Sequence, residues 1–297
     1  MRTSLEKCLI SALVAAKKAG DDILEVYHGD IDVTYKEDNS PLTLADERAH
    51  RTILKILPSF SQNDIPILSE EGKDIPYEQR AEWEYLWLVD PLDGTKEFVK
   101  RRDEFTVNIA LIEKNRPVVG VVFLPALGTL YFAAEGLGSY KLEKVERVGH
   151  LLDDAGNSSE KTLDLGVVVE GALRLPSRQA TGRPSNQINL VGSRSHGTEA
   201  LAVFVEKMQQ NYDKVGFVPA GSALKFCLVA EGKADLYPRF GPTMEWDTAA
   251  GHCVVEQCGG AVVRMNQKTS LVYNKKDLHN PHFICLGRSF KGVSLPL

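Results

Sequence analysis

The sequence lacks the features that mark several large classes of protein. Its five cysteines are an odd number, lie far apart and form no Cys-x-x-Cys pair or Cys/His cluster, which argues against a zinc site and a disulfide framework. No stretch approaches the roughly 18 apolar residues that a membrane-spanning helix needs. Charged residues interrupt the amino-terminal apolar positions, so the core of a signal peptide is missing. These absences predict a cytoplasmic protein with reduced, buried cysteines.

An excess of positive charge is also missing. The 35 Lys and Arg residues are outnumbered by 40 Asp and Glu, which gives a formal net charge of −5 and argues against a protein whose main task is to coat nucleic acid. A small anionic substrate remains compatible with this balance, because bound metal cations can concentrate positive charge locally. With 297 residues, 43% of them hydrophobic, the chain is expected to form about two soluble domains, 1–160 and 161–297.

Apolar periodicity predicts mixed α and β structure. Apolar residues recur mostly three and four positions apart over 5–27, which predicts an amphipathic helix, and a second helix is expected from about 43 to 57, ended by Pro58. Short apolar runs between 65 and 135 predict sheet strands. Later elements alternate as in an α/β layer: strands near 188–191, 236 and 261–263, and helices at 198–208, 222–231 and 248–258.

The densest chemical signal follows a strand that is apolar at every position. Residues 86–89 predict a strand buried on both faces, and the motif Asp-Pro-Leu-Asp-Gly-Thr follows directly at 90–95. Because Pro91 cannot continue an interior strand, the chain is expected to turn there. The turn would direct two carboxylates and a carbonyl into one cavity. An ordinary Asp turn is the alternative.

In such a turn Asp90, Asp93 and the Leu92 carbonyl would face a common point. The backbone N–H groups of Gly94 and Thr95 would lie at the start of a short helix beside them. Carboxylates, a carbonyl and backbone amides suit a divalent metal that holds a phosphate.

Further carboxylates occur in comparable positions. Glu70 and Glu71 follow the apolar run 65–68, and Asp247 precedes a predicted helix. The glutamates could instead be a solvated strand end, and Asp247 a helix N-cap. Taken together, the oxygen-only set favours Mg²⁺, with Mn²⁺ as a substitute, over zinc. The Asp-x-x-Asp spacing also differs from the Asp-x-Asp of haloacid dehalogenase phosphatases, so both aspartates are interpreted as ligands of two metals that activate a water.

Three motifs make the chain resemble a known family. It is similar to the lithium-sensitive, Mg²⁺-dependent phosphatases that include inositol monophosphatase, fructose-1,6-bisphosphatase and the bisphosphate nucleotidases. The motifs are PILSEE at 66–71, WLVDPLDGT at 87–95 and WDTAAGH at 246–252. Within this family the chain resembles the bacterial CysQ-type 3'(2'),5'-bisphosphate nucleotidases, through segments 39–50, 85–112, 193–196 and 221–252. The similarity fails mainly across 143–187.

The resemblance implies an α/β fold of mixed α+β type, a two-domain layered αβαβα sandwich. Residues 1–160 would be an N-terminal α+β domain that carries most of the metal site. Residues 161–297 would be a C-terminal α/β domain that carries Asp247 and the nucleotide-binding residues.

The resemblance also implies the metal ligands. Glu70, Asp90 and the Leu92 carbonyl would hold one Mg²⁺, and Asp90, Asp93 and Asp247 would hold a second. A third, weaker ion would lie near Glu70. Inhibition by lithium is expected from the resemblance alone.

Two catalytic residues, Asp46 and Thr95, follow from the same resemblance. Asp46 would accept the hydroxyl proton of Thr95, and this hydroxyl would orient the attacking water. The spacing of Thr43 and Asp46 also predicts a helix capping box, so Asp46 has a structural alternative.

The substrate is expected to be a small phosphorylated nucleotide. Lys225 would pair with a second phosphate and His196 would contact the nucleoside, although each could be an ordinary surface residue. The resemblance implies hydrolysis of the 3'-phosphate of 3'-phosphoadenosine 5'-phosphate to AMP, in sulfate assimilation, without a nucleic acid partner or an integral membrane segment. The expected substrate-binding residues are Glu70, Leu92, Asp93, Gly94, Thr95, Ser193, His196, Gly221, Lys225 and Asp247.

Two alternatives remain at this point. The same metal chemistry could act on inositol phosphates or fructose 1,6-bisphosphate, since only the segments SRSH (193–196) and GSALK (221–225) argue for a nucleotide. A non-catalytic Mg²⁺ or Ca²⁺ protein is disfavoured, because a structural site needs no pair such as Thr95 and Asp46. The sequence leaves open whether the protein is a monomer or a homodimer, and whether it associates peripherally with the cytoplasmic face of the inner membrane.

Overall fold

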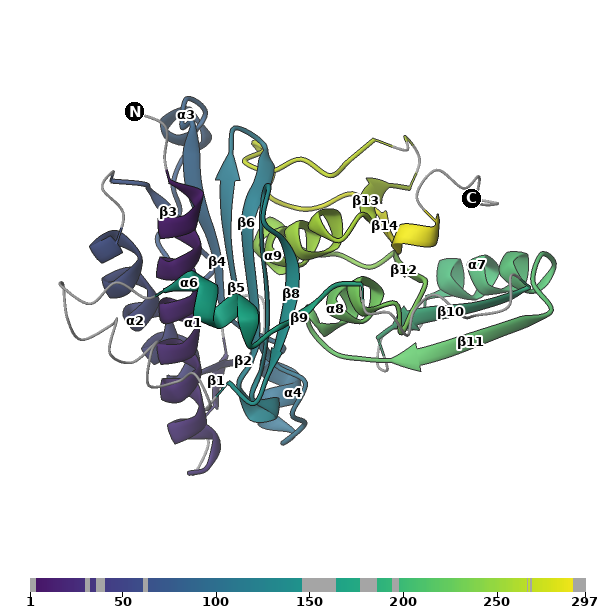
Figure 1. Cartoon of the computed structure of the whole chain (residues 1–297), viewed down its shortest axis with the longest axis horizontal. Coiled ribbons are helices and arrows are strands. Elements are labelled where there is room, and N and C mark those ends of the chain that lie inside the picture. Colours follow the sequence, from purple (N-terminus) through teal and green to yellow (C-terminus); the bar gives the residue numbers. More distant parts are fainter. Residues whose placement is uncertain are drawn as a thin grey trace.

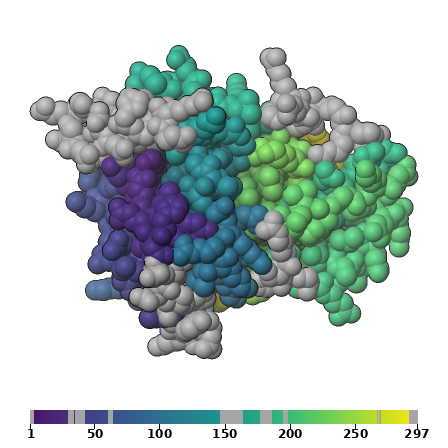
Figure 2. Space-filling model, turned by 90° about the horizontal axis from the view of Figure 1, so that it is seen from below, coloured from purple at the N-terminus to yellow at the C-terminus, as the bar shows by residue number. Residues whose placement is uncertain are grey.

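The computed structural model describes residues 4–29, 33–35, 41–60, 64–145, 164–176, 186–193, 198–265, 267 and 269–290. They form five layers in the order helices, sheet, helices, sheet, helix (Figure 1). The first half of the chain, purple to teal, and the second half, green to yellow, lie side by side (Figure 2). The expected αβαβα sandwich is thus confirmed.

The first sheet has seven strands in the order β3-β4-β5-β6-β7-β8-β9. β3 runs parallel to β4, and the other neighbouring pairs are antiparallel. Trp87 and Val89 of β4 belong to the core on one face, and Leu86 and Leu88 to the core on the other, which explains the apolar run. The strands are β3 (Ile67–Ser69), β4 (Tyr85–Asp93), β5 (Thr106–Glu113), β6 (Arg116–Leu124), β7 (Thr129–Ala134), β8 (Gly138–Glu143) and β9 (Leu173–Arg174).

Two long helices, α1 (Leu5–Tyr27) and α2 (Leu44–Phe60), cover the outer face of this sheet. The expected end of the second helix at Pro58 was wrong, because α2 continues to Phe60. Pro58 removes one backbone hydrogen bond from the last turn. The turn persists because the Ser11 hydroxyl donates to the Leu57 carbonyl at 3.1 Å and the Ser59 hydroxyl donates to the Lys55 carbonyl at 2.9 Å.

The middle layer consists of α8 (Leu224–Glu231) and α9 (Glu245–Gln257), packed between the two sheets. The second sheet has the strand order β11-β10-β12-β14-β13, and α7 (Glu199–Gln209) covers its outer face. Its strands are β10 (Gln187–Gly192), β11 (Lys214–Pro219), β12 (Leu236–Arg239), β13 (Ala261–Arg264) and β14 (Phe283–Leu286). The smaller elements are β1 (Val33–Tyr35), β2 (Pro41–Thr43), α3 (Tyr77–Arg80), α4 (Thr95–Val99), α6 (Leu165–Glu170), and the 3₁₀ turns Pro125–Leu127 and Arg288–Phe290.

The expected domain boundary between residues 160 and 161 falls outside the described residues and stays a prediction. Beyond it, Leu165 and Val168 of α6 still pack in the core of the first sheet, and β10 is the first strand of the second sheet along the chain. All five cysteines are buried and unpaired, as expected. Among the described helices, none combines the length and apolar character needed to cross a membrane.

Two glycines allow close packing of the middle layer: Gly120 lies where α9 meets the first sheet, and Gly251 lies where α9 meets α8. A Cβ on Gly120 of β6 would lie 2.5 Å from the Ala250 carbonyl oxygen of α9. A Cβ on Gly251 would lie 2.6 Å from Cγ of Phe226 in α8. Displacing a backbone carbonyl or the Cγ of a buried ring costs free energy, because the interior is close-packed.

Replacing Gly120→Ala is therefore expected to lower the free energy of unfolding by roughly 1–3 kcal/mol, because the added methyl overpacks the contact between β6 and α9. Gly171→Ala is the matched control, since a Cβ there would approach its neighbours only to 3.6 Å. The control should change stability by less than about 0.5 kcal/mol. Urea denaturation followed by circular dichroism measures both variants. Equal stability of Gly120→Ala and the parent would contradict the close approach.

Candidate active site

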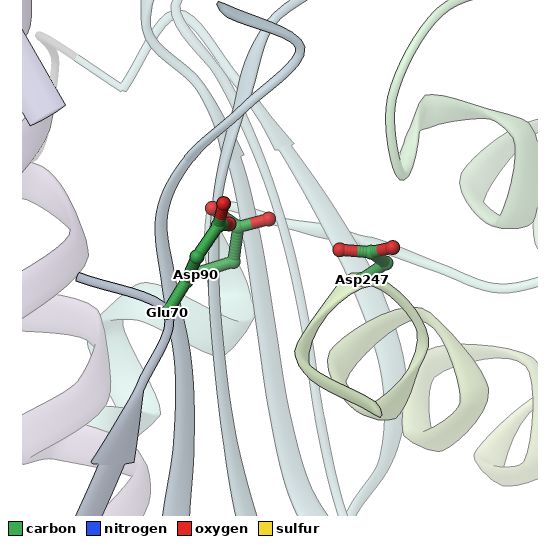
Figure 3. Close-up of side chains that lie close together, drawn as sticks. All are labelled: Glu70, Asp90 and Asp247. Carbon is green, nitrogen blue, oxygen red and sulfur yellow. The ribbon is translucent and has the colours of Figure 1, made fainter. Parts of the chain in front are cut away.

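Three carboxylates from three elements meet at the carboxyl-terminal ends of β3 and β4 (Figure 3). Glu70 directly follows β3, Asp90 lies in β4, and Asp247 lies in the first turn of α9. One carboxylate oxygen of each lies within 4.8 Å of the others. Parallel pairing of β3 with β4 holds Glu70 beside Asp90, because the Glu70 N–H donates to the Val89 carbonyl at 3.0 Å. Glu71 is not part of this cluster.

The expected turn at Pro91 was wrong. β4 continues to Asp93, with Asp90 opposite Asn108 of β5 and Asp93 opposite Thr106, so that one extra residue forms a β-bulge. β3 ends at Ser69, which pairs with Val89 of β4. Pro91 lies beyond this last pair, so no residue of β3 would need a hydrogen bond from the backbone N–H that proline lacks. The bulge, rather than a turn, aims both aspartates at the site.

Asp93 lies beside the cluster of three carboxylates. Its Oδ2 accepts hydrogen bonds from the Asn108 side-chain amide at 3.4 Å and from the Thr106 hydroxyl at 3.5 Å. The Leu92 N–H donates to Asp90 Oδ1 at 3.1 Å, and the Leu92 carbonyl lies 3.3 Å from the Thr95 hydroxyl, whose single proton it shares with Asp46. These contacts fix the backbone between the two aspartates.

Burial and mutual repulsion oppose the charged forms of these carboxyls. Burial, reinforced by the charges of Glu70 and Asp93, raises the pKa of Asp90 well above its usual range. Burial and the charge of Asp93 raise the pKa of Asp247 to about 8. Burial raises the pKa of Asp93 to about 6, although the Lys225 ammonium acts in the opposite direction. A divalent cation would relieve this repulsion, and the oxygen-only donor set fits a hard cation such as Mg²⁺.

Asp46 makes the helix-capping contacts that the sequence predicted and also contacts Thr95. Its Oδ2 accepts from the backbone N–H of Thr43 at 2.8 Å and from the Thr43 hydroxyl at 2.7 Å, which caps α2. Its Oδ1 accepts from the hydroxyl of Thr95 at 3.3 Å. The cap thus holds a buried carboxylate so that its second oxygen faces Thr95.

Asp247 is not the N-cap residue that the sequence allowed. α9 begins at Glu245, three residues earlier than expected, and Asp247 is its third residue. The carboxylate accepts from the Met244 N–H at 2.8 Å and so helps to cap the helix. Capping and participation in the carboxylate cluster therefore coexist in Asp247.

A pocket of about 130 Å³ opens beside these carboxylates. Six residues expected at the site contribute to its wall: Asp93, Gly94, Ser193, Gly221, Lys225 and Asp247. Gly94 has a φ of +89°, which a side chain would disfavour, and it precedes α4. His196 lies outside the described residues, so its predicted contact with the nucleoside stays a prediction.

Lys225 is buried at this pocket, so its interpretation as a solvated helix lysine was wrong. Its Nζ donates to the Ser222 carbonyl at 2.7 Å and lies 5.5 Å from the ring centroid of Tyr237. Burial lowers the pKa of Lys225 to about 8, and the charge of Asp93 opposes this effect. The pocket therefore places a buried cation close to an anionic site.

Sequence reasoning missed Arg239, which lines the same pocket. Its Nη2 donates to the Pro242 carbonyl at 2.9 Å, whereas its buried Nε has no hydrogen-bond partner among the described residues. The position of Arg239 at the end of a predicted strand, just before Gly241 and Pro242, was the signal that could have identified it. Ser222, Glu97, Tyr237 and Thr243 were also missed as lining residues.

Comparison with known proteins places this geometry in a family. The model of the inositol monophosphatase family matches residues 4–291. The chain is 43% identical over 270 residues to the 3'(2'),5'-bisphosphate nucleotidase CysQ of Salmonella typhimurium, covering 90% of this chain and 95% of the relative. It is 34% identical over 288 residues to the CysQ of Haemophilus influenzae, covering 97% and 95%.

Solved structures agree with these relatives. CysQ from Bacteroides thetaiotaomicron superposes with a TM-score of 0.80 at 42% identity, covering 94% of this chain and 97% of that one. An inositol monophosphatase from Thermotoga maritima superposes with a TM-score of 0.68 at 22% identity, covering 95% and 92%, and shows the shared fold. Because the family match spans nearly all of the described fold and the carboxylate site within it, the chain belongs to the inositol monophosphatase family.

Proposed function

We propose that this protein is a Mg²⁺-dependent 3'(2'),5'-bisphosphate nucleotidase that converts adenosine 3',5'-bisphosphate to AMP and phosphate, as part of sulfate assimilation. The observation that carries the proposal is one pocket with a carboxylate site at its wall and two cationic side chains, Lys225 and Arg239, beside it. A bisphosphate brings two anionic groups, one for metal ions and one for these cations. CysQ relatives at 42–43% identity support the same substrate.

Members of this family depend on a metal ion, generally Mg²⁺, and the cluster of Glu70, Asp90 and Asp247 fits that requirement. In our proposal Glu70, Asp90 and the Leu92 carbonyl hold one ion, and Asp90, Asp93 and Asp247 hold a second. A third, weaker ion near Glu70 and replacement by Mn²⁺ belong to the same proposal. When bound, the ions neutralise phosphoryl oxygens and lower the pKa of water.

The protein's own contribution to proton transfer comes from Thr95 and Asp46. Because the Thr95 hydroxyl donates to Asp46 Oδ1, its oxygen can accept a hydrogen bond from the attacking water. One proton can then pass from water to Thr95 while the Thr95 proton passes to Asp46. The hydrogen bonds from Thr43 keep the Asp46 carboxylate in place during this transfer.

The substrate is held from both sides of the pocket. The N–H groups of Gly94 and Thr95 donate to the phosphoryl group that is removed. Lys225 and Arg239 bind the second phosphate, while Ser193, Gly221 and His196 contact the nucleoside. Inositol monophosphate is not favoured, because a single phosphate leaves the two cations without an anionic ligand, and the curated CysQ relatives also disfavour fructose 1,6-bisphosphate. A cytoplasmic location remains part of the proposal.

The substrate class is tested by Mg²⁺-dependent phosphate release from adenosine 3',5'-bisphosphate, inositol 1-phosphate and fructose 1,6-bisphosphate. We expect kcat/KM for the nucleotide to exceed the other two by about 10²-fold or more. Inositol 1-phosphate leaves the two cations of the pocket without an anionic ligand, and the CysQ relatives disfavour fructose 1,6-bisphosphate. AMP should be the product. A preference for either of the other substrates would contradict the assignment of the pocket.

Asp93→Asn tests the two-metal arrangement, because it removes a ligand charge without changing the size of the side chain. We expect a loss of kcat/KM of about 10³-fold or more with an unchanged circular dichroism spectrum. Asp74→Asn, at an exposed position, is the matched control and should retain full activity. Full activity of Asp93→Asn would show that the second metal is assigned to the wrong residues.

The proton path is tested at Thr95 with two variants that differ in a hydroxyl. Thr95→Val removes the group that connects water with Asp46 and should lower kcat by about 10²-fold or more. Thr95→Ser keeps the hydroxyl and should stay within about tenfold of the parent enzyme. Steady-state kinetics with saturating substrate and Mg²⁺ compares them. Equal activity of Thr95→Val and Thr95→Ser would exclude the hydroxyl from catalysis.

A further inference from the structure

The loop that brings Lys225 to the pocket is held by the first half of the chain. We call residues 220–223 the pocket loop, which joins β11 to α8. The Gly221 N–H donates to Glu104 Oε2 at 2.9 Å, and the Ser222 hydroxyl donates to the Asp93 carbonyl at 2.9 Å. Two hydrogen bonds therefore connect the pocket loop to the region that carries Asp93.

The packing around these hydrogen bonds is tight. A Cβ on Gly221 would lie 3.0 Å from the Glu104 carbonyl oxygen and 3.2 Å from Glu104 Cβ. Gly94 faces the loop in a similar way, because a Cβ on it would collide with the Ser222 hydroxyl. Ser222 has a φ of +47°, a region that L-residues rarely adopt. Contacts with residues outside the pocket loop, rather than the backbone preference of Ser222, therefore hold the loop in this conformation.

Glu104 is attached to a rigid part of the first sheet. It directly precedes Phe105, which is fully buried. The ring centroid of Phe105 lies 5.2 Å from that of Phe98 and 4.8 Å from that of Tyr27. The following residue, Thr106, pairs with Asp93 across the β-bulge. The Glu104 backbone and Asp93 are consequently fixed to each other.

The pocket loop in turn fixes the Lys225 ammonium. Lys225 Nζ donates to the Ser222 carbonyl at 2.7 Å, and the side chain is buried, so the ammonium follows any displacement of the loop. Lys225 and Asp93 line the same pocket. The separation between the ammonium and the carboxylate site must match the separation of two phosphates in a bisphosphate.

We infer that Glu104 is a positioning residue that sets this separation through the Gly221 N–H and so favours substrates with two phosphates. The inference rests on the proposed function, because it takes a nucleoside bisphosphate as the substrate. Glu104 acts through the pocket loop and not on the substrate itself. A ligand with one phosphate, bound at the carboxylate site, does not use Lys225 and is insensitive to this anchor.

The test measures KM and kcat for adenosine 3',5'-bisphosphate and the competitive Ki of adenosine 3'-phosphate, with the full chain and Mg²⁺. Glu104→Asp keeps the charge but withdraws the carboxylate from Gly221, whereas Glu104→Gln keeps the length and an acceptor oxygen. We expect Glu104→Asp to raise KM roughly tenfold, with kcat changed by less than about threefold and Ki unchanged. Glu104→Gln should retain a KM close to that of the parent.

Lys225→Met provides a second readout. In that background Glu104→Asp should leave KM unchanged, because the ammonium that it positions is absent. A further tenfold increase of KM in the Lys225→Met background would overturn the positioning role. So would an equal increase, in Glu104→Asp alone, of KM for the bisphosphate and Ki of adenosine 3'-phosphate. Ser222→Ala removes the second connection and is expected to produce the same selective rise in KM, which keeps the inference testable should Glu104→Asp unfold.

Failure of the proposed function is recognised separately. It would appear as absence of phosphate release from the bisphosphate by the parent enzyme, before any variant is compared, and would overturn this inference as well. A parent enzyme that is active on the bisphosphate, with a KM that Glu104→Asp leaves unchanged, would overturn the inference alone.

Discussion

Repulsion among buried carboxylates is the constraint on which the rest of this structure depends. Asp90 is almost completely buried, and its charge is opposed by burial and by neighbouring carboxylates. Backbone interactions nevertheless hold the group together: strand pairing fixes Glu70 beside Asp90, and helix capping fixes Asp247. Because the backbone resists the separation of these groups, a divalent cation would allow their charges to be accommodated together.

The layered fold provides that resistance. The middle helices pack against both sheets, and close contact at Gly120 of β6 holds α9, with Asp247 in its first turn, against the sheet that carries Asp90. The neighbouring helix α8 brings Lys225 to the pocket from the same layer. The first sheet thus supplies Asp90, whereas the middle layer supplies both Asp247 and Lys225, so the spacing of these groups depends on the packing between the two layers and on the loops at the pocket.

Local patterns predicted much of this structure. The buried strand before Asp90 and the helix beginning near Thr198 follow from apolar periodicity and capping, which act over a few residues. Pro91 misled the prediction because its effect depends on where β3 ends, and Pro58 because a contact from Ser11 of α1 supports the last turn of α2. These are tertiary effects that a local pattern does not contain.

The missing elements and residues have a similar explanation. β11 is a half-exposed edge strand without a clear apolar alternation, and it was not predicted. β14 was also missed, although all four of its residues are buried. Glu104 contacts Gly221 across 117 positions of sequence, a pairing that only the folded chain creates. Asp247 was identified as a candidate ligand from its place before a predicted helix, and Asp46 as a catalytic candidate from the resemblance. Only the hydrogen-bond geometry shows that helix capping does not exclude a second contact of either carboxylate.

The central claim, that the carboxylate site is destabilised by its own charges and stabilised by a divalent cation, is tested most directly by thermal unfolding at pH 8 in EDTA and in excess Mg²⁺. The account predicts that Mg²⁺ raises the Tm of the parent chain. It also predicts that Asp90→Asn is at least as stable as the parent in EDTA and gains little from Mg²⁺. An unchanged Tm of the parent in Mg²⁺, or an equal gain in Asp90→Asn, would contradict it.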